Sequence, residues 1–246
     1  MSQSEKSCPV ISEISQTTQN GFSLYVKQDG IDYLAILNQF RSGTLLAEKL
    51  ENECRDRDVY QITLDGRYYI LKHDREVDRR FEKLLWQWLG GPFYSNMMKK
   101  VNFANSQGCD FVQDIFLVAE KLQNRICVES FVLMEYKVGQ PLSHIAHPQQ
   151  YYPQILDLFS RLHRFRLASN DIHLGNFIVG ADGQISIIDL SARGARAICQ
   201  ANDVIALKNK FGLSLPVHGL LNYLVYRLIA AKQSLRSFSR MLRKKR

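Results

Sequence analysis

The sequence lacks the long hydrophobic run of a membrane-spanning helix, and it lacks the apolar core of a signal peptide. No uninterrupted apolar stretch approaches the roughly 20 residues that a spanning helix needs. The N-terminal stretch MSQSEKSCPVISEISQTTQN is mostly polar. We therefore expect a folded protein that is neither secreted nor threaded through a membrane.

Paired cysteines are also missing. The five cysteines lie far apart and form no C-x-x-C pair. Scattered cysteines are typical of a reducing compartment, where they serve as small buried hydrophobes. His144 and His147 are close in sequence but have no cysteine beside them, and structural zinc usually takes four ligands. Neither a disulfide framework nor a zinc site is expected.

Acidic residues are absent from the C-terminal stretch, which holds eight Lys or Arg residues from Arg227 onward and accounts for the whole net charge of +8. A helix there would separate an apolar face from a basic face (Leu228, Ala231, Leu235, Phe238 and Leu242 against Lys232, Arg236 and Arg240). Such a helix either lies on an anionic membrane surface or packs on the protein with a solvated end. No nucleic-acid-binding module accompanies it, so we expect no nucleic-acid partner.

The chain changes character near residues 136–139. The pattern before this point predicts strands, and the pattern after it predicts mostly helices, so the fold class is α+β. We expect a flexible segment at residues 1–18, a strand-rich lobe at 19–136 and a helical lobe at 137–246.

Several elements can be placed within this outline. We expect a strand at 22–28, two short helices between 31 and 52, and a hairpin turning at Asp65-Gly66. A helix over 75–89 and two strands around a turn near 123–124 follow. In the C-terminal half, one helical face is predicted from Ile155, Leu158, Phe159, Leu162 and Phe165.

The stretch SNDIHLGNFIVGADGQISIIDLS, residues 169–191, joins an apolar hairpin to polar ends. Asn176 precedes its first strand and Asp189 follows its second. Because paired strands lie about 4.8 Å apart, these two side chains should be neighbours. An amide oxygen and a carboxylate suit a hard cation such as Mg²⁺. Asp171 lies five residues before Asn176 and can face the same space without binding the metal.

This arrangement is what phosphoryl transfer needs: one carboxylate to accept a hydroxyl proton, and an Asn and an Asp to hold metal. The alternative is that Asp and Asn only form turns, as Asp182-Gly183 does. An isolated D-x-x-x-x-N also occurs by chance. The hairpin that ends in Asp189 favours the catalytic interpretation.

The segment NDIHLGNFIV…ISIIDLS resembles the catalytic and metal loops of the protein-kinase-like superfamily, in the form found in small-molecule kinases. The resemblance implies a two-lobed kinase-like fold, with an antiparallel-sheet N-lobe that binds nucleotide and a mainly helical catalytic C-lobe. It implies that Asp171 is the catalytic base and that Asn176 and Asp189 are the metal ligands. His173 matches the histidine of the small-molecule variant.

The same resemblance predicts the nucleotide site. Lys72 ends a hairpin strand, and Glu82 on the following helix is our choice to hold it, with Glu76 second. The segment VLMEYKVGQPL looks like the hinge that reads adenine, with Met134 as gatekeeper. There, the Glu135 carbonyl and the Lys137 amide are the expected partners of the base.

Two parts of the kinase pattern are missing. No glycine-rich phosphate loop occurs where ENECRDRDVYQ stands, so Arg55 or Arg57 either reaches the phosphates or is a surface charge. The histidine before the catalytic aspartate is replaced by Ser169-Asn170. The proton acceptor and both metal ligands remain.

A closer resemblance covers most of the chain from about residue 21. LHRFRLASNDIHLGNFIVGADGQISIIDLSARG with ANDVIALKNKFG is similar to the lipopolysaccharide core heptose(II) kinases of Gram-negative bacteria. It implies transfer of the ATP γ-phosphate to a heptose hydroxyl of the inner core, with Mg²⁺, by a protein peripheral on the cytoplasmic face of the inner membrane. Asp203 belongs to the same pattern, and we interpret it as a structural support of the catalytic loop.

A membrane-borne acceptor favours the anionic membrane surface as the partner of the basic helix. Arg193 and Arg196 are candidates to contact acceptor phosphates. Two alternatives stay open: a kinase for another small-molecule or protein hydroxyl, and a kinase-like binding module without turnover. The basic balance of the chain disfavours a cationic aminoglycoside as substrate.

Overall fold

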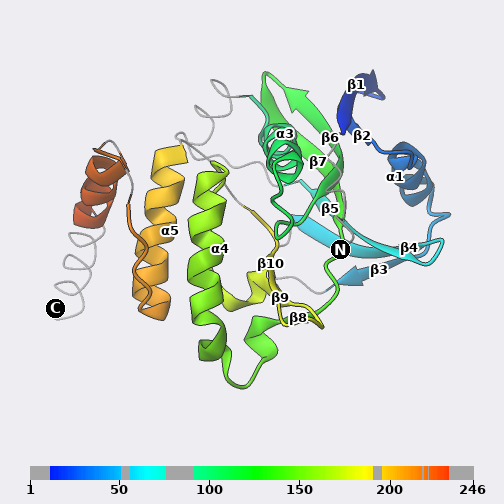
Figure 1. The fold of residues 1–246 in the computed structure, drawn as a ribbon. Helices are drawn as coiled ribbons and strands as arrows, with labels where there is room; N and C mark the ends of the chain where they lie inside the picture. The colour runs from blue at the N-terminus through cyan, green and yellow to red at the C-terminus, as the bar shows by residue number, and fades with distance from the viewer. Residues whose placement is uncertain are drawn as a thin grey trace, which may run out of the picture. The chain divides into compact units, whose positions relative to one another are not determined.

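The computed structural model describes residues 12–50, 56–75, 91–190, 196–217, 219–220 and 222–232 (Figure 1). The chain divides into two units, Met1–Lys137 and Val138–Arg246. An antiparallel sheet dominates the first unit and helices dominate the second. This arrangement confirms the predicted α+β class.

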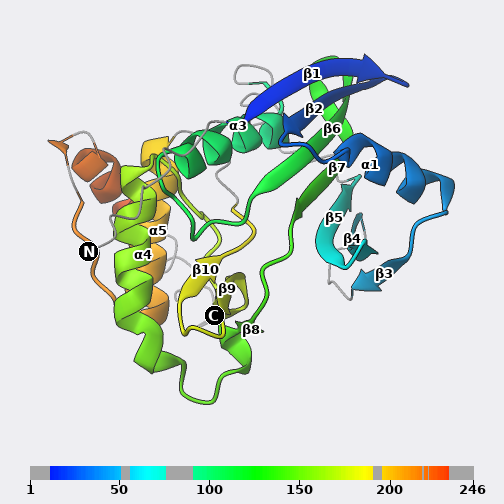
Figure 2. The same ribbon diagram turned by 45° about the vertical axis from the view of Figure 1, so that its right-hand side comes forward.

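The first unit is built on a seven-stranded antiparallel sheet in the order β1-β2-β6-β7-β5-β4-β3. Its elements are β1 Glu13–Gln19, β2 Phe22–Gln28, α1 Tyr33–Ser42, β3 Ala47–Leu50, β4 Arg57–Leu64, β5 Arg67–Asp74, α3 Phe93–Ser106, β6 Ile115–Gln123 and β7 Ile126–Glu135. The β1–β2 hairpin continues the sheet at one edge (Figure 2).

Local turn chemistry fixes two of the hairpins. Asp65 and Gly66, between β4 and β5, both have positive φ (50° and 72°), as a two-residue hairpin turn requires, and this confirms the predicted turn. Asn20 and Gly21 do the same between β1 and β2 (53° and 78°). The Asn-Gly signal was present in the sequence, but its hairpin was not predicted.

The two faces of the sheet bury different helices. Tyr33, Ile36 and Leu37 of α1 pack with a cluster that includes Leu71 and Leu117. Side chains alternate along a strand, so the residue after Leu117 on β6 faces the other way. On that second face the main-chain amides at the start of α3 bind a side chain of β6. The central strands are therefore covered on both sides, which explains their continuous apolar runs.

The second unit contains two long helices, α4 and α5, which run side by side (Figures 1 and 2). Its elements are β8 Gln140–Pro141, α4 Tyr152–Arg164, β9 Phe177–Val179, β10 Ile185–Ile187 and α5 Arg196–Phe211, with short 3-10 turns at Leu142–His144, Pro148–Tyr151 and Leu174–Asn176. The three strands form a small antiparallel sheet in the order β10-β9-β8. Four of the five predicted α4 core residues are buried, and Phe165 is half-buried just after the helix.

Two sequence predictions are wrong in the first unit. Residues 13–18 are not a flexible lead-in, because they form β1 and pair with β2; residues 1–11 lie outside the described part. The second predicted helix, from Leu45, Leu46 and Leu50, is the edge strand β3, because pairing with β4 outweighs the local helical spacing. α3 was not predicted at all.

The helix predicted over 75–89 lies almost wholly outside the described residues, so Glu82 and Glu76 do too. In the described part of the chain, no helix is both long and apolar enough to cross a bilayer.

Candidate active site

The loop that carries Asp171 is anchored from α5 by one buried carboxylate. Asp203 has no exposed surface. Its Oδ1 accepts a hydrogen bond from the Asn170 amide at 2.6 Å, and its Oδ2 accepts one from the Ser169 amide at 3.0 Å. His163 of α4 places its Nε2 at 3.1 Å from the same Oδ2. These contacts confirm that Asp203 supports the loop from behind.

The residue before Asp171 has an unusual backbone. Asn170 adopts the left-handed conformation, with φ of 57°, which Asn tolerates better than most residues. Its side-chain oxygen accepts a hydrogen bond of 2.8 Å from Asn202. The Ser169 hydroxyl donates to the Asp171 carbonyl at 3.2 Å. The main chain around Asp171 is thus held on several sides, while the Asp171 side chain itself is exposed.

The backbone at Asn176 and the backbone at Asp189 lie at one end of the β9–β10 hairpin. Phe177 pairs with Ile187, and the Ile188 amide donates to the Asn176 carbonyl at 2.9 Å. Asp189 therefore follows directly after the residue bonded to Asn176. Asp189 also has the left-handed conformation, with φ of 55°, which turns the chain away from the strand.

The side-chain oxygens of Asn176 and Asp189 are of the kind that binds a hard cation. The Asn176 amide nitrogen donates to the Asp171 carbonyl at 2.9 Å, which leaves the amide oxygen as the atom that the side chain can offer to a ligand. Amide and carboxylate oxygens are the usual protein ligands of Mg²⁺. No group of three or more His, Cys, Asp or Glu side chains gathers to hold a metal among the described residues. A metal bound here would take its ligands from Asn176, Asp189, water and substrate oxygens.

In the first unit, Lys72 lies on β5 between Val59 of β4 and Val132 of β7. Only 8% of its surface is exposed. A lysine held this deeply on a sheet face differs from an ordinary solvated charge. Its predicted partner, Glu82, lies outside the described residues.

The predicted arginine substitutes for the glycine-rich loop have different outcomes. Arg55 lies outside the described residues. Arg57 begins β4 and makes an ion pair with Asp74 of β5, with Nη2 2.8 Å from Oδ2. Tyr94 donates its hydroxyl hydrogen to the same oxygen at 2.9 Å. The Arg57 guanidinium is thus bound to a carboxylate of the neighbouring strand, β5.

The hinge segment contains a contact that the sequence did not reveal. Met134 is buried and pairs with Ile70. The Glu135 carbonyl, predicted to bind adenine, accepts a hydrogen bond of 2.7 Å from the side-chain amide of Gln113. A carbonyl oxygen has two lone pairs, so Gln113 takes one and leaves one. The Lys137 ammonium lies 2.9 Å from the Glu135 carboxylate.

A second unpredicted residue is the buried carboxylate at the start of α3. Glu120 of β6 accepts hydrogen bonds from the Tyr94 and Ser95 amides at 2.9 and 3.3 Å through Oε1. Its Oε2 has no hydrogen-bond partner among the described residues. Burial raises the pKa of Glu120. No local motif marks Glu120, because its partners lie 25 and 26 residues away.

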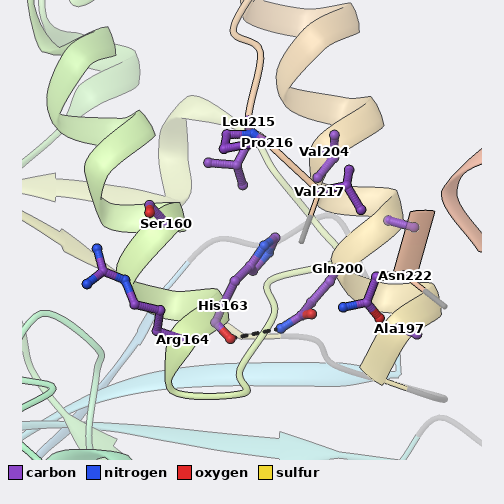
Figure 3. Close-up of a pocket in the computed structure, with 11 residues that line it drawn as sticks. Ser160, His163, Arg164, Ala197, Gln200, Val204, Leu215, Pro216, Val217 and Asn222 are labelled. Atoms are coloured by element: carbon purple, nitrogen blue, oxygen red, sulfur yellow. Dashed lines mark hydrogen bonds between the residues drawn. The ribbon is translucent and has the colours of Figure 1, made fainter. Parts of the chain in front are cut away.

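A cavity of about 440 Å³ opens in the second unit between α4, α5 and residues 215–217 (Figure 3). His163 and Gln200 line it, and the Gln200 amide donates to the His163 carbonyl at 3.2 Å. None of the predicted site residues is among the residues that line it. Of the acceptor candidates, Arg196 begins α5, and Arg193 lies outside the described residues.

The sheet unit, the helical unit and the polar end of the β9–β10 hairpin follow the order expected of a kinase-like protein. Residues 13–245 match the family described as "Lipopolysaccharide core biosynthesis protein (WaaY)". The chain belongs to this family, which confirms the resemblance seen in the sequence.

Two relatives are lipopolysaccharide core heptose(II) kinases WaaY. The protein of Escherichia coli strain K12 is 28% identical over 223 residues, which are 90% of this chain and 94% of the relative. A second Escherichia coli protein is 27% identical over 202 residues, 82% of this chain and 87% of the relative. The solved structure "WaaP in complex with acyl carrier protein" aligns with a TM-score of 0.49 and 14% identity, covering 85% of this chain and 90% of that one.

Proposed function

We propose that the chain is an ATP-dependent heptose kinase that phosphorylates a hydroxyl of the second heptose of the lipopolysaccharide core. The observation that carries the proposal is the Asp171 loop, with Asn176 and Asp189 together at the end of one hairpin. Membership of the WaaY family, and relatives named as heptose(II) kinases, supply the acceptor.

Asp171 is the proton acceptor in this proposal. Its exposed carboxylate takes the proton of the heptose hydroxyl as the hydroxyl oxygen bonds to the γ-phosphorus, while the bond from that phosphorus to the β–γ bridging oxygen breaks and ADP leaves. Asp203 keeps the loop in place through the Ser169 and Asn170 amides. Because Asp203 is fully buried, its proposed role is positioning.

Asn176 and Asp189 are the residues that would hold Mg²⁺. When bound, the metal neutralises charge on the transferring phosphate and orients it. The hairpin supplies the two ligands from adjacent strand ends, so no large rearrangement of the chain is needed to bring them together.

The nucleotide is assigned to the first unit. Lys72 is the candidate partner of the phosphates, with Glu82 holding it. The adenine edge is assigned to the Glu135 carbonyl and the Lys137 amide. Gln113 already donates to that carbonyl, so the base shares the oxygen with Gln113 or displaces its amide.

The proposed acceptor, a lipid-linked core saccharide, indicates where in the cell the protein acts. A core saccharide built on a lipid is reached from a membrane surface, and the C-terminal segment carries eight basic residues and no acid. We assign the protein to the cytoplasmic face of the inner membrane of a Gram-negative bacterium, bound peripherally through this segment.

The test is transfer of labelled γ-phosphate from ATP to purified core lipopolysaccharide that lacks heptose phosphate. We expect labelled core with the wild-type protein, and none above background with Asp171→Ala or after EDTA, with recovery on adding Mg²⁺. Asp157→Ala, at an exposed position of α4, is the matched control and should label normally. Equal labelling by Asp171→Ala and wild type would remove Asp171 from the mechanism.

A further inference from the structure

The helix near the C-terminus is apolar on nearly every side. Residues 220 and 222–232 are helical in the described chain (Figure 1). Between residues 220 and 231, only Asn222 and Arg227 are neither aliphatic nor aromatic. A helix that is apolar all round is usually covered on all sides, by protein or by lipid.

Among the residues that the structure describes, only one side of this helix is covered. Val225, Tyr226 and Ile229 are partly buried. The opposite side is exposed, and its large apolar residues are Leu220 (76% exposed), Tyr223 (45%), Leu224 (51%) and Leu228 (72%). They follow helical spacing of three and four residues, so they form one continuous strip, which we call the leucine face. Singly exposed leucines are ordinary, but a strip of them marks a contact surface.

The charge beside the leucine face selects its partner. Arg227 and Lys232 belong to the same helix, and six more Lys or Arg residues follow, up to and including Arg246, with no acid. A second copy of the chain would bring eight further positive charges to the same place, which opposes self-association. A nucleic acid would satisfy the charges but leave the leucines exposed to water. An anionic bilayer satisfies both.

One contact within the strip suits the boundary between water and lipid. Arg227 donates from Nη1 to the Tyr223 hydroxyl at 3.3 Å, and its guanidinium lies 6.0 Å from the Tyr223 ring centre. Tyrosine and arginine with apolar stems and polar tips are typical of the headgroup layer. The polar tips of Tyr223 and Arg227 are therefore suited to contact lipid headgroups while the leucines beside them contact the acyl chains.

We propose that the leucine face inserts into the interfacial layer of an anionic bilayer and docks the second unit on the membrane that carries the acceptor. This proposal names the surface that contacts the membrane. It rests on the membrane partner given under the proposed function, and it does not depend on the phosphoryl-transfer step. Insertion adds apolar contact to the electrostatic attraction of the basic segment, and an interfacial helix generally uses both. The Asp171 loop belongs to the same unit, so docking acts on the unit that meets the acceptor.

The test is co-sedimentation of the full chain with vesicles of phosphatidylglycerol and phosphatidylcholine, and with vesicles of phosphatidylcholine alone. The variant is the triple change Leu220→Gln, Leu224→Gln and Leu228→Gln, since glutamine keeps helix propensity. The matched control is Leu46→Gln, which changes a leucine that is 77% exposed in the first unit. Circular dichroism and thermal unfolding establish that each variant is folded.

We expect wild type and Leu46→Gln to bind the anionic vesicles alike, and the triple variant to bind about tenfold or more weakly. Binding by the triple variant equal to that of wild type would overturn the proposal and leave the basic segment as the sole attachment. A wild-type dimer in solution that the triple variant converts to a monomer would also overturn it, in favour of a second copy as the partner.

A second readout separates this proposal from the kinase assignment. With water-soluble, deacylated core saccharide, the triple variant should phosphorylate at the wild-type rate, whereas with core embedded in vesicles it should be slower by about the loss in binding. If no protein phosphorylates either acceptor while the vesicle result stands, the function proposed above fails and the docking surface survives.

Discussion

Asp203 is a fully buried residue whose side chain holds the loop that leads to Asp171. Its two oxygens take the amides of Ser169 and Asn170 and stand beside His163, so the loop leading to Asp171 has one fixed course. A buried carboxylate bonded in this way is worth more than a surface pair, because removing it strands several donors away from water.

Replacing Asp203 by Asn should therefore lower kcat much more than it raises KM for ATP. The asparagine side chain carries no charge, and its NH2 group would face main-chain N–H groups that need an acceptor. We therefore also expect the free energy of unfolding to fall by about 2–4 kcal/mol. Steady-state kinetics with urea unfolding measures both effects. Asp157→Asn on α4 is the control and should change neither, because Asp157 is mainly exposed. A proportional rise in KM with unchanged kcat would contradict a positioning role.

Glu120 gives the chain a pH dependence that can be isolated. Burial raises its pKa above the ordinary value of 4.5, so the folded state binds this proton more tightly than the unfolded state. The stabilising contribution is fully present below pH 4.5 and is lost as the pH rises through the raised pKa of the folded protein.

Glu120→Gln removes this titration. We expect the free energy of unfolding of the variant to gain on that of wild type as pH rises from 4.5, and the difference to level off above the raised pKa. Urea unfolding at a series of pH values measures it. Glu48→Gln, at an exposed site on β3, should track wild type throughout. A difference that shrinks with rising pH would contradict the assigned direction.

At the scale of elements, β9 depends on a glycine that lets two strands meet. Gly139 has φ of 153°, and a Cβ there would lie 2.3 Å from the Val179 carbonyl oxygen of β9. Gln140 of β8 pairs with Val179, so the backbone has little room to move away. β9 is also the strand that starts directly after Asn176, which couples the fit at Gly139 to the candidate metal site.

Gly139→Ala should destabilise the second unit and reduce phosphoryl transfer. Gly183→Ala is the matched control, because Gly183 also has positive φ (75°) but a Cβ there meets nothing within 4 Å. Backbone strain of about 1 kcal/mol is common to both variants, and overpacking adds about 1–3 kcal/mol to the first alone. Thermal unfolding of the two variants compares them. Equal losses would mean that the close approach to β9 is unimportant.

The elements that could be predicted are those whose signals are local. Asp65-Gly66 specifies its turn from two residues, and the α4 core face follows from helical spacing. β1 was missed because an exposed edge strand is polar, so its composition resembles that of a disordered lead-in. α3 was missed because Pro92 makes no side-chain cap, and Glu120 from a distant strand binds its first amides instead.

In the candidate site, too, local signals could be predicted from the sequence and long-range contacts could not. Asn176 and Asp189 flank one hairpin, so spacing alone predicts that the backbone at the two ends lies together, as the pairing of Phe177 with Ile187 bears out. Gln113 could not be found in this way, because its contact with the Glu135 carbonyl joins residues 22 positions apart and depends on how β6 meets β7. The heptose acceptor came from family resemblance, and no spacing encodes it.

At the scale of the whole molecule, the positive charge is concentrated in one stretch, and this supports the membrane attachment that we propose. The Lys and Arg residues before residue 227 are equal in number to all the Asp and Glu residues, so the net charge of +8 lies entirely in the C-terminal stretch. A neutral body with one basic end is suited to orient on an anionic surface. The WaaY family match covers residues 13–245, and so includes parts of both units and most of this basic end.

The most direct test of the central claim is the position of the transferred phosphate. Wild-type protein, ATP and Mg²⁺ would be incubated with two purified acceptors, a core that ends at the first heptose and a core that carries the second heptose without phosphate. Mass spectrometry with fragmentation then locates any phosphate gained. We predict one phosphate, on the second heptose, and none on the shorter core. Phosphate on the first heptose of both cores, or on neither core, would contradict the assignment as a heptose(II) kinase.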